Sequence, residues 1–67
     1  MAVVICRVVE VVAQQGGGWT ALTRRTGLPR HVIQRLRRAD ANPSLLVAQR
    51  VAHALDVTIE TLWQVRP

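Results

Sequence analysis

The chain has 67 residues and a formal net charge of +5, and both values limit what it can be. A chain of this length forms one small domain, residues 1–67, with no room for a second core. Its length is near the lower limit for folding without a partner subunit. A single cysteine, Cys6, excludes an internal disulfide and is typical of a reduced, cytoplasmic setting.

The composition favours packed helices. Hydrophobic residues make up 49% of the chain, but Phe and Tyr are absent, so Leu, Val, Ile and Ala must fill the interior. We therefore expect an all-α fold. The apolar start of the chain has no basic residue ahead of it and is broken by Arg7 and Glu10, which argues against a signal peptide or a membrane span.

The positive charge is concentrated in the middle of the chain. Residues 11–39 contain six arginines and no acidic residue. Lys is absent, which the base composition of a gene can also explain, but that does not account for the clustering. A localised basic patch is typical of a protein that binds a polyanion.

Residues 3–15 carry two competing signals. Helical spacing places on one face Val4, Val8, Val11 and Gln15. The run of β-branched residues is also a strand signal. We expect a helix because the segment adjoins clear helices. Val9 and Val12 would then lie off the buried stripe, either as a dimer surface or as scattered surface residues.

Two further helices follow the glycines at 16–18. The second is expected over residues 19–26, with Gly18 or Thr20 as its N-cap. Gly27 makes a tight turn, and the third helix runs from Pro29 or Arg30 to about Arg38. Proline is tolerated in a first helical turn because its missing N–H has no helical partner there.

The last two helices come after a polar break. Ser44 is a good N-cap for a fourth helix over 45–55, and its expected buried stripe contains Leu45, Ala48, Val51, Ala52 and Leu55. Thr58 caps a fifth helix, with Glu60 in its first turn where the helix dipole favours an acid. Trp63 at its end either completes the core or joins a dimer interface.

The second and third helices form a helix-turn-helix unit, residues 19–38. Their spacing about Gly27 lets four apolar side chains meet across the turn: Leu22, Leu28, Ile33 and Leu36. At 100° per residue, the third helix buries Val32, Ile33 and Leu36. The opposite face carries only basic or polar groups: Arg30, His31, Gln34, Arg35 and Arg38.

These side chains match the chemistry of DNA. Arginine pairs with guanine O6 and N7, and glutamine pairs with adenine N6 and N7. Arg37, at the flank of the third helix, suits a phosphate. Arg24 and Arg25, at the end of the second helix, suit phosphates as well.

The segment from Trp19 to Trp63 resembles the Xre/Cro-type helix-turn-helix domain of phage repressors, small bacterial regulators and antitoxins. The resemblance rests on Leu22, TGL at 26–28, VIQRL at 32–36, NPS at 42–44 and AQRVAHALDVTIETLW at 48–63. It implies a compact five-helix, phage-repressor-like fold. It also implies base contacts from Arg30, His31, Gln34 and Arg35, with Val32 available to a thymine methyl.

The resemblance places phosphate contacts at the start of the second helix, at Trp19 or Thr20, and just after the third, at Arg37 and Arg38. The chain departs from the family at four places. At the start of the second helix, Trp19 or Thr20 stands where the family often has Gln or Ser. Thr23 replaces alanine and risks overpacking, Pro29 replaces a capping serine, and Ala39 replaces the glycine after the third helix.

Other chemistry is not indicated. His31, His53 and Cys6 have no zinc-ligand spacing, and we expect His53 on the surface and Cys6 near the core. The glycines at 16–18 do not precede a Lys-Ser/Thr pair, so they are not a phosphate-binding loop. We expect no enzyme activity, no metal and no cofactor.

The sequence therefore predicts a sequence-specific double-stranded DNA-binding transcriptional regulator, a repressor, acting as a homodimer. The alternative is an antitoxin-like or other protein-interaction module whose main partner is a toxin or another protein. The Val-rich first helix and Trp63 motivate that alternative. A third option is a purely structural helical domain.

Overall fold

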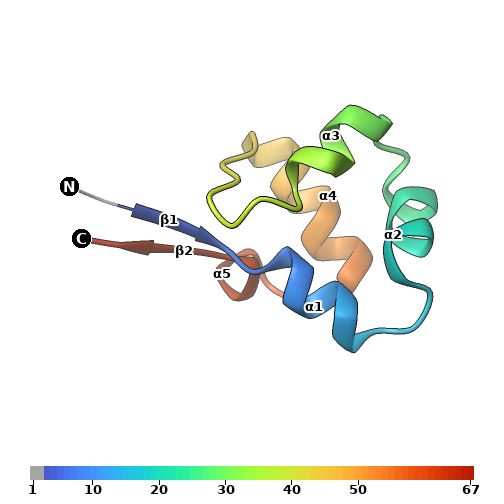
Figure 1. The fold of residues 1–67 in the computed structure, drawn as a ribbon, viewed down its shortest axis with the longest axis horizontal. Coiled ribbons are helices and arrows are strands. Elements are labelled where there is room, and N and C mark those ends of the chain that lie inside the picture. The colour runs from blue at the N-terminus through green and yellow to red at the C-terminus, as the bar shows by residue number, and fades with distance from the viewer. Residues whose placement is uncertain (1–2) are drawn as a thin grey trace.

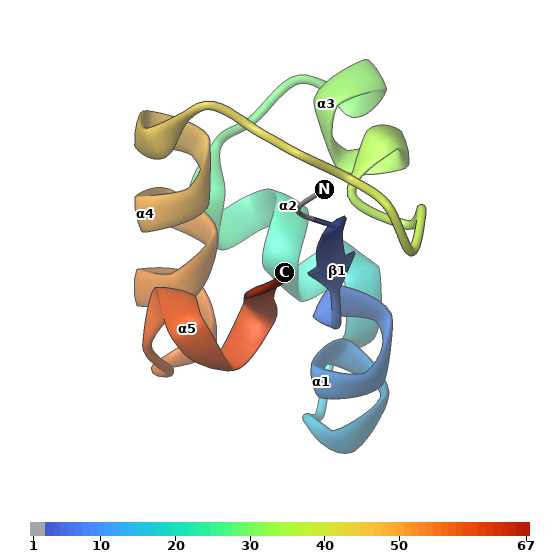
Figure 2. The ribbon, with the colours of Figure 1, turned by 90° about the vertical axis from the view of Figure 1, so that its left-hand side faces the viewer.

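The computed structural model describes residues 3–67, which form five helices and two short strands (Figure 1). In chain order these are β1 (Val3–Cys6), α1 (Val8–Gln14), α2 (Gly18–Thr26), α3 (Arg30–Arg35), α4 (Leu45–Leu55), α5 (Ile59–Leu62) and β2 (Trp63–Arg66). The helices pack into one body, and the two strands project from it side by side. Figure 2, viewed along the strands, shows the helices arranged behind them.

The expected all-α fold is wrong. β1 and β2 form an antiparallel ladder in which Cys6 lies opposite Trp63 and Val3 lies opposite Arg66. The helix expected over 3–15 begins only at Val8, because the β-branched residues before it take the extended backbone that they favour. The fifth helix, expected to reach Trp63, ends at Leu62 because Trp63 belongs to β2.

Every helical segment contributes to one hydrophobic core. The largest fully buried side chains are Val8, Leu22, Leu36, Val51 and Leu62. Cys6 and Trp63 extend the core to the base of the sheet, and Trp63 is only 9% exposed. Trp63 therefore completes the core, which is one of the two roles expected for it.

Two predictions about buried stripes are wrong. Val12 is buried because it lies one turn after the fully buried Val8 on the same face of α1, whereas Val9 is exposed as predicted. Leu45 is 68% exposed because, at the first position of α4, it lies beyond the end of the core.

The polar caps confirm two helix starts. The Ser44 hydroxyl accepts a hydrogen bond from the Val47 N–H at 3.3 Å, and the Thr58 hydroxyl accepts one from the Thr61 N–H at 3.3 Å. The N-cap of α2 is Gly17, rather than Gly18 or Thr20. Gly17 has a φ of +89°, a left-handed conformation that glycine adopts without strain.

Candidate nucleic-acid interface

The turn between α2 and α3 has the predicted construction. Gly27 adopts a left-handed φ of +68°, and its N–H donates to the Thr23 carbonyl at 3.0 Å. Leu22, Ile33 and Leu36 are buried in the same cluster, with Leu28 packed against it. Apolar contacts therefore hold the inner side of α3 to the body.

Thr26, to which the sequence assigned no role beyond its place in TGL at 26–28, stabilises this turn. Thr26 is buried, and its hydroxyl donates to the Leu22 carbonyl at 2.9 Å and accepts from the Leu28 N–H at 3.3 Å. A threonine directly before the turn glycine was the available signal. Thr23, where crowding was expected, is half-buried and donates its hydroxyl to the Trp19 carbonyl at 2.8 Å.

α3 is shorter than the predicted helix over 30–38. Pro29 is its N-cap and offers no side-chain hydrogen bond, as predicted, and α3 ends at Arg35. Beyond this end, the N–H of Arg37 and of Arg38 each donate to a carbonyl three residues earlier, at 3.2 Å. Such tight turns are common where a helix ends. Arg37 and Arg38 therefore lie in a turn outside the regular helix.

The predicted base-reading residues all lie on the outer side of α3. Arg30, His31, Gln34 and Arg35 are exposed, and Val32 is half-buried. These residues do not form one uniform face. Arg30 and Gln34 line one hollow of the surface, and Val32 and Arg35 line another.

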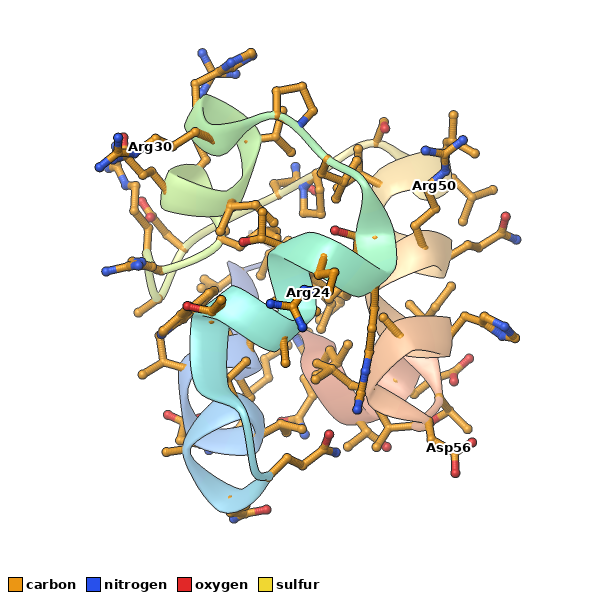
Figure 3. All side chains as sticks on the ribbon, turned by 90° about the vertical axis from the view of Figure 1, so that its right-hand side faces the viewer. Arg24, Arg30, Arg50 and Asp56 are labelled. Carbon is orange, nitrogen blue, oxygen red and sulfur yellow. The ribbon has the colours of Figure 1, made fainter. Side chains whose placement is uncertain are left out.

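The first hollow is a groove of about 570 Å³ between α2 and α3. Its polar lining joins predicted base readers to predicted phosphate contacts: Thr20, Arg24, Arg30, Gln34 and Arg37. Trp19, Thr23 and Ile33 complete it, and no acidic residue of the described chain lines it. Figure 3 shows Arg24 projecting from α2 and Arg30 from α3 on the same side of the molecule. We call this the basic groove.

Trp19 holds one arginine of the basic groove in place. The guanidinium carbon of Arg37 lies 4.7 Å from the centroid of the Trp19 ring, within the range of a cation–π contact. No sequence pattern predicts this pair, because 18 positions separate the two residues along the chain. This contact favours one position of the exposed Arg37 guanidinium, by about 0.5–1 kcal/mol.

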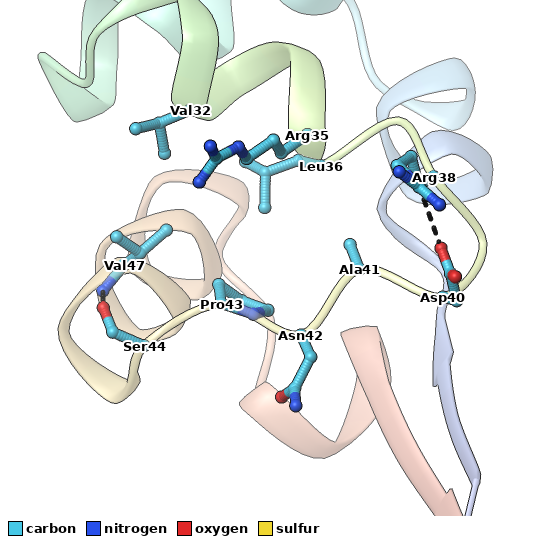
Figure 4. A pocket seen from close by; sticks show the side chains of 10 residues that line it. All are labelled: Val32, Arg35, Leu36, Arg38, Asp40, Ala41, Asn42, Pro43, Ser44 and Val47. Carbon is cyan, nitrogen blue, oxygen red and sulfur yellow. Dashed lines mark hydrogen bonds and ion pairs between the residues drawn. The ribbon is translucent and has the colours of Figure 1, made fainter.

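The second hollow, of about 480 Å³, lies between the end of α3 and the start of α4 (Figure 4). Val32 and Arg35 line it, together with Arg38 and apolar residues of the α3–α4 connection. Arg38 donates to the Asp40 carboxylate at 3.2 Å, and both side chains are largely exposed. Asp40 therefore offsets part of the positive charge on this side.

One predicted phosphate contact is engaged within the protein. The Arg25 guanidinium donates to the Ala54 carbonyl near the end of α4, at 3.4 Å. A cation there is favoured by the free carbonyls of the helix C-terminus. Arg24, one position earlier, lines the basic groove instead.

The remaining candidate chemistry is limited to Cys6. Its thiol is buried and donates to the Leu36 carbonyl at 3.6 Å, and desolvation by burial raises its pKa. Within residues 3–67, no three His, Cys, Asp or Glu side chains gather as a metal site would require. His53 is exposed, as predicted.

None of the helices between residues 3 and 67 combines the length and apolar character needed to cross a bilayer. Comparison with known proteins gives no match: no protein-family model, no curated protein and no solved structure corresponds to this chain.

Proposed function

We propose that this chain is a sequence-specific double-stranded DNA-binding transcriptional regulator, a cytoplasmic repressor that acts as a homodimer and reads the major groove with α3. The observation that carries the proposal is the basic groove, where Arg24, Arg30 and Arg37 meet Thr20 and Gln34 without an acidic neighbour. The resemblance of residues 19–63 to the Xre/Cro-type domain also supports it.

The dimensions of α3 suit this role. Its six residues span roughly 9 Å, and the major groove of B-DNA, about 12 Å wide, admits an α-helix. The apolar side of α3 is held by Ile33, so the opposite side is free to enter the groove. His31 and Arg35 lie on that exposed side.

The two flanks of α3 would contact different parts of the DNA. On the α2 flank, Arg30 and Gln34 are one helical turn apart and offer donors to guanine and adenine edges. Arg24 and Arg37 beside them are placed to neutralise phosphates. On the other flank, the half-buried Val32 offers a methyl contact to thymine.

Selection of bound duplexes from a random pool tests this proposal most directly. We expect an enriched motif, present as two half-sites about 34 Å apart because the homodimer presents two copies of α3. The affinity for that duplex should fall with salt, with a log–log slope of about −0.9 for each phosphate contacted. No enrichment, or an affinity independent of salt, contradicts the proposal.

A second candidate function is an antitoxin-like protein-interaction module. Leu45 and Leu46 at the start of α4 are 68% and 61% exposed, and they adjoin a hollow lined partly by Val32, Pro43 and Val47. A stoichiometric protein that co-purifies from the native host, and is lost in Leu46→Lys while DNA binding persists, would favour this function. Equal recovery with wild type and Leu46→Lys would contradict it.

A further inference from the structure

By the alternation of an antiparallel ladder, each strand of the described chain has one residue whose backbone groups point outward without a ladder partner, Val4 in β1 and Val65 in β2. In an antiparallel pair, the N–H and C=O of one residue point to the same side, and successive residues alternate between the partner strand and the outside. The Cys6 N–H donates to the Ala39 carbonyl at 2.7 Å, so it points away from β2. The connection between α3 and α4 therefore covers the outer edge of β1 at Cys6.

The same alternation assigns the outer edge of β2. The Trp63 N–H, opposite Cys6, bonds to the Ile59 carbonyl of α5, so it points away from β1. Val65, two residues further along, must point its N–H and C=O the same way. Within the described residues β1 is the only strand paired with β2, so these two groups have no ladder partner.

The side chain at this position is also unusual. Val65 is 66% exposed, although it lies on the sheet face that carries Trp63 into the core. Val4 is directly opposite Val65 and is half-buried against the core. An open edge with an exposed β-branched side chain is a template for pairing with another strand.

We propose that β2 is the dimer interface of this protein: β2 pairs antiparallel with β2 of a second copy, about a two-fold axis at Val65. The two ladders then become one four-stranded sheet. This inference rests on the homodimer of the proposed function, but it is tested without DNA, so the two can fail separately.

The edge of β2 is complementary to itself, which favours a second copy over a different protein. With the axis at Val65, the two Val65 residues exchange both backbone hydrogen bonds, and Gln64 faces Arg66 of the second copy. No like charges are directly opposite in this register, and the two Arg66 side chains are diagonal neighbours. Two Val4 and two Val65 side chains then form one apolar cluster across the axis.

The geometry also limits the assembly to two copies. A two-fold contact uses the same surface on both chains and closes on itself. The Arg66 N–H points toward β1 and Pro67 has no N–H, so the new ladder gains no donor beyond Val65. The interface is therefore small, and we expect a weak, concentration-dependent dimer.

Sedimentation velocity of the full chain over a series of protein concentrations tests the proposal. The series should reach about 1 mM, so that a dimer with a dissociation constant as weak as about 1 mM is detected. Wild type should pass from monomer to dimer. Val65→Lys and Val65→Pro should raise the dissociation constant at least about tenfold, a change of about 1.4 kcal/mol. Proline removes only the outward N–H, so the ladder with β1 keeps its hydrogen bonds.

Two matched controls should leave the dimer unchanged. Val3→Gln changes an exposed valine of the same ladder on the opposite face without placing a second cation beside Arg66, and Leu46→Lys changes the other exposed apolar site. Amide exchange at Val65 gives an independent measurement, since its N–H should become protected as concentration rises. A wild-type chain that stays monomeric, or association that Leu46→Lys abolishes and Val65→Pro does not, overturns the proposal.

Discussion

The Arg37 guanidinium lies over the face of the Trp19 ring, with 4.7 Å between the guanidinium carbon and the ring centroid. Trp19 comes from the first turn of α2, and Arg37 from the turn that follows α3. The contact therefore joins the two helices of the candidate interface at the wall of the basic groove. An arginine held in advance loses less conformational freedom when it contacts a phosphate.

Trp19→Leu and Arg37→Ala should affect DNA binding non-additively. A cation–π contact at an exposed site contributes about 0.5–1 kcal/mol, so we expect a coupling energy of that size in a double-mutant cycle. Fluorescence anisotropy with the selected duplex measures it. Trp19→Leu with Arg35→Ala is the control pair and should be additive, because Arg35 lines the other hollow. Additive effects in both pairs would argue against the positioning role of Trp19.

Arg35 and Arg24 should differ in what they contribute to specificity. Arg35→Ala should relax the preference at one base pair by about 1–3 kcal/mol, since a base-edge contact is lost. Arg24→Ala should weaken all duplexes alike and make the salt slope shallower by about 1. Binding profiles against a panel of single-base variants separate the two. If Arg35→Ala keeps the wild-type profile, its assignment as a base reader is wrong.

Thr26→Val should destabilise the fold by about 1–3 kcal/mol, because it removes one hydrogen bond and leaves the Leu28 N–H without its acceptor. Valine has nearly the same shape, so packing changes little. Urea denaturation measures the loss. Thr20→Val is the matched control: Thr20 is exposed in the basic groove, so its stability should hold while DNA affinity falls. Equal stabilities for the two variants would refute the role of Thr26.

Gly17→Ala should destabilise the protein by about 1–3 kcal/mol through backbone strain and overpacking. A Cβ at Gly17 would lie 2.6 Å from the Ala21 Cβ, and the φ of +89° is left-handed. Gly16→Ala is the control, since a Cβ there meets nothing within 4 Å. Thermal unfolding should show a lower midpoint for Gly17→Ala only. Equal midpoints would mean that the start of α2 rearranges at no cost.

The stability of the protein should fall as the pH rises above 9. Burial raises the pKa of the Cys6 thiol above its ordinary value of 9.0. Between these two values the unfolded chain has lost the Cys6 proton while the folded chain still holds it, so ionisation favours unfolding, by up to about 1.4 kcal/mol per pH unit. Below the ordinary value this contribution is fully present.

Composition makes this measurement unusually clean. The chain contains no Tyr, and all nine basic residues are arginine, so no other side chain titrates between pH 9 and 11. Urea denaturation at pH 8 and pH 10 should show the loss in wild type and not in Cys6→Ala. An identical pH dependence in both proteins would exclude Cys6 as the cause.

The features that local sequence patterns predicted correctly are the turn, the buried side of α3 and two helix starts. Gly27 marked the turn, and the spacing of Leu22, Ile33 and Leu36 predicted which side of α3 is buried. Ser44 and Thr58 marked two helix starts correctly. In each case the residues that interact belong to one helix start or to two consecutive helices joined by a short turn, so a pattern in the chain describes the contact directly.

The sequence by itself thus determined the α2–Gly27–α3 unit and the concentration of arginine in it. The tertiary structure decided two further things. It made Val3–Cys6 a strand by pairing it with Trp63–Arg66, and it placed Arg24, Arg30 and Arg37 in one groove while engaging Arg25 and Arg38 elsewhere. Both outcomes depend on contacts between residues distant in the chain. The backbone groups of residues 3–6 that point toward β2 find hydrogen-bond partners only when β2, some 60 positions away, pairs with them.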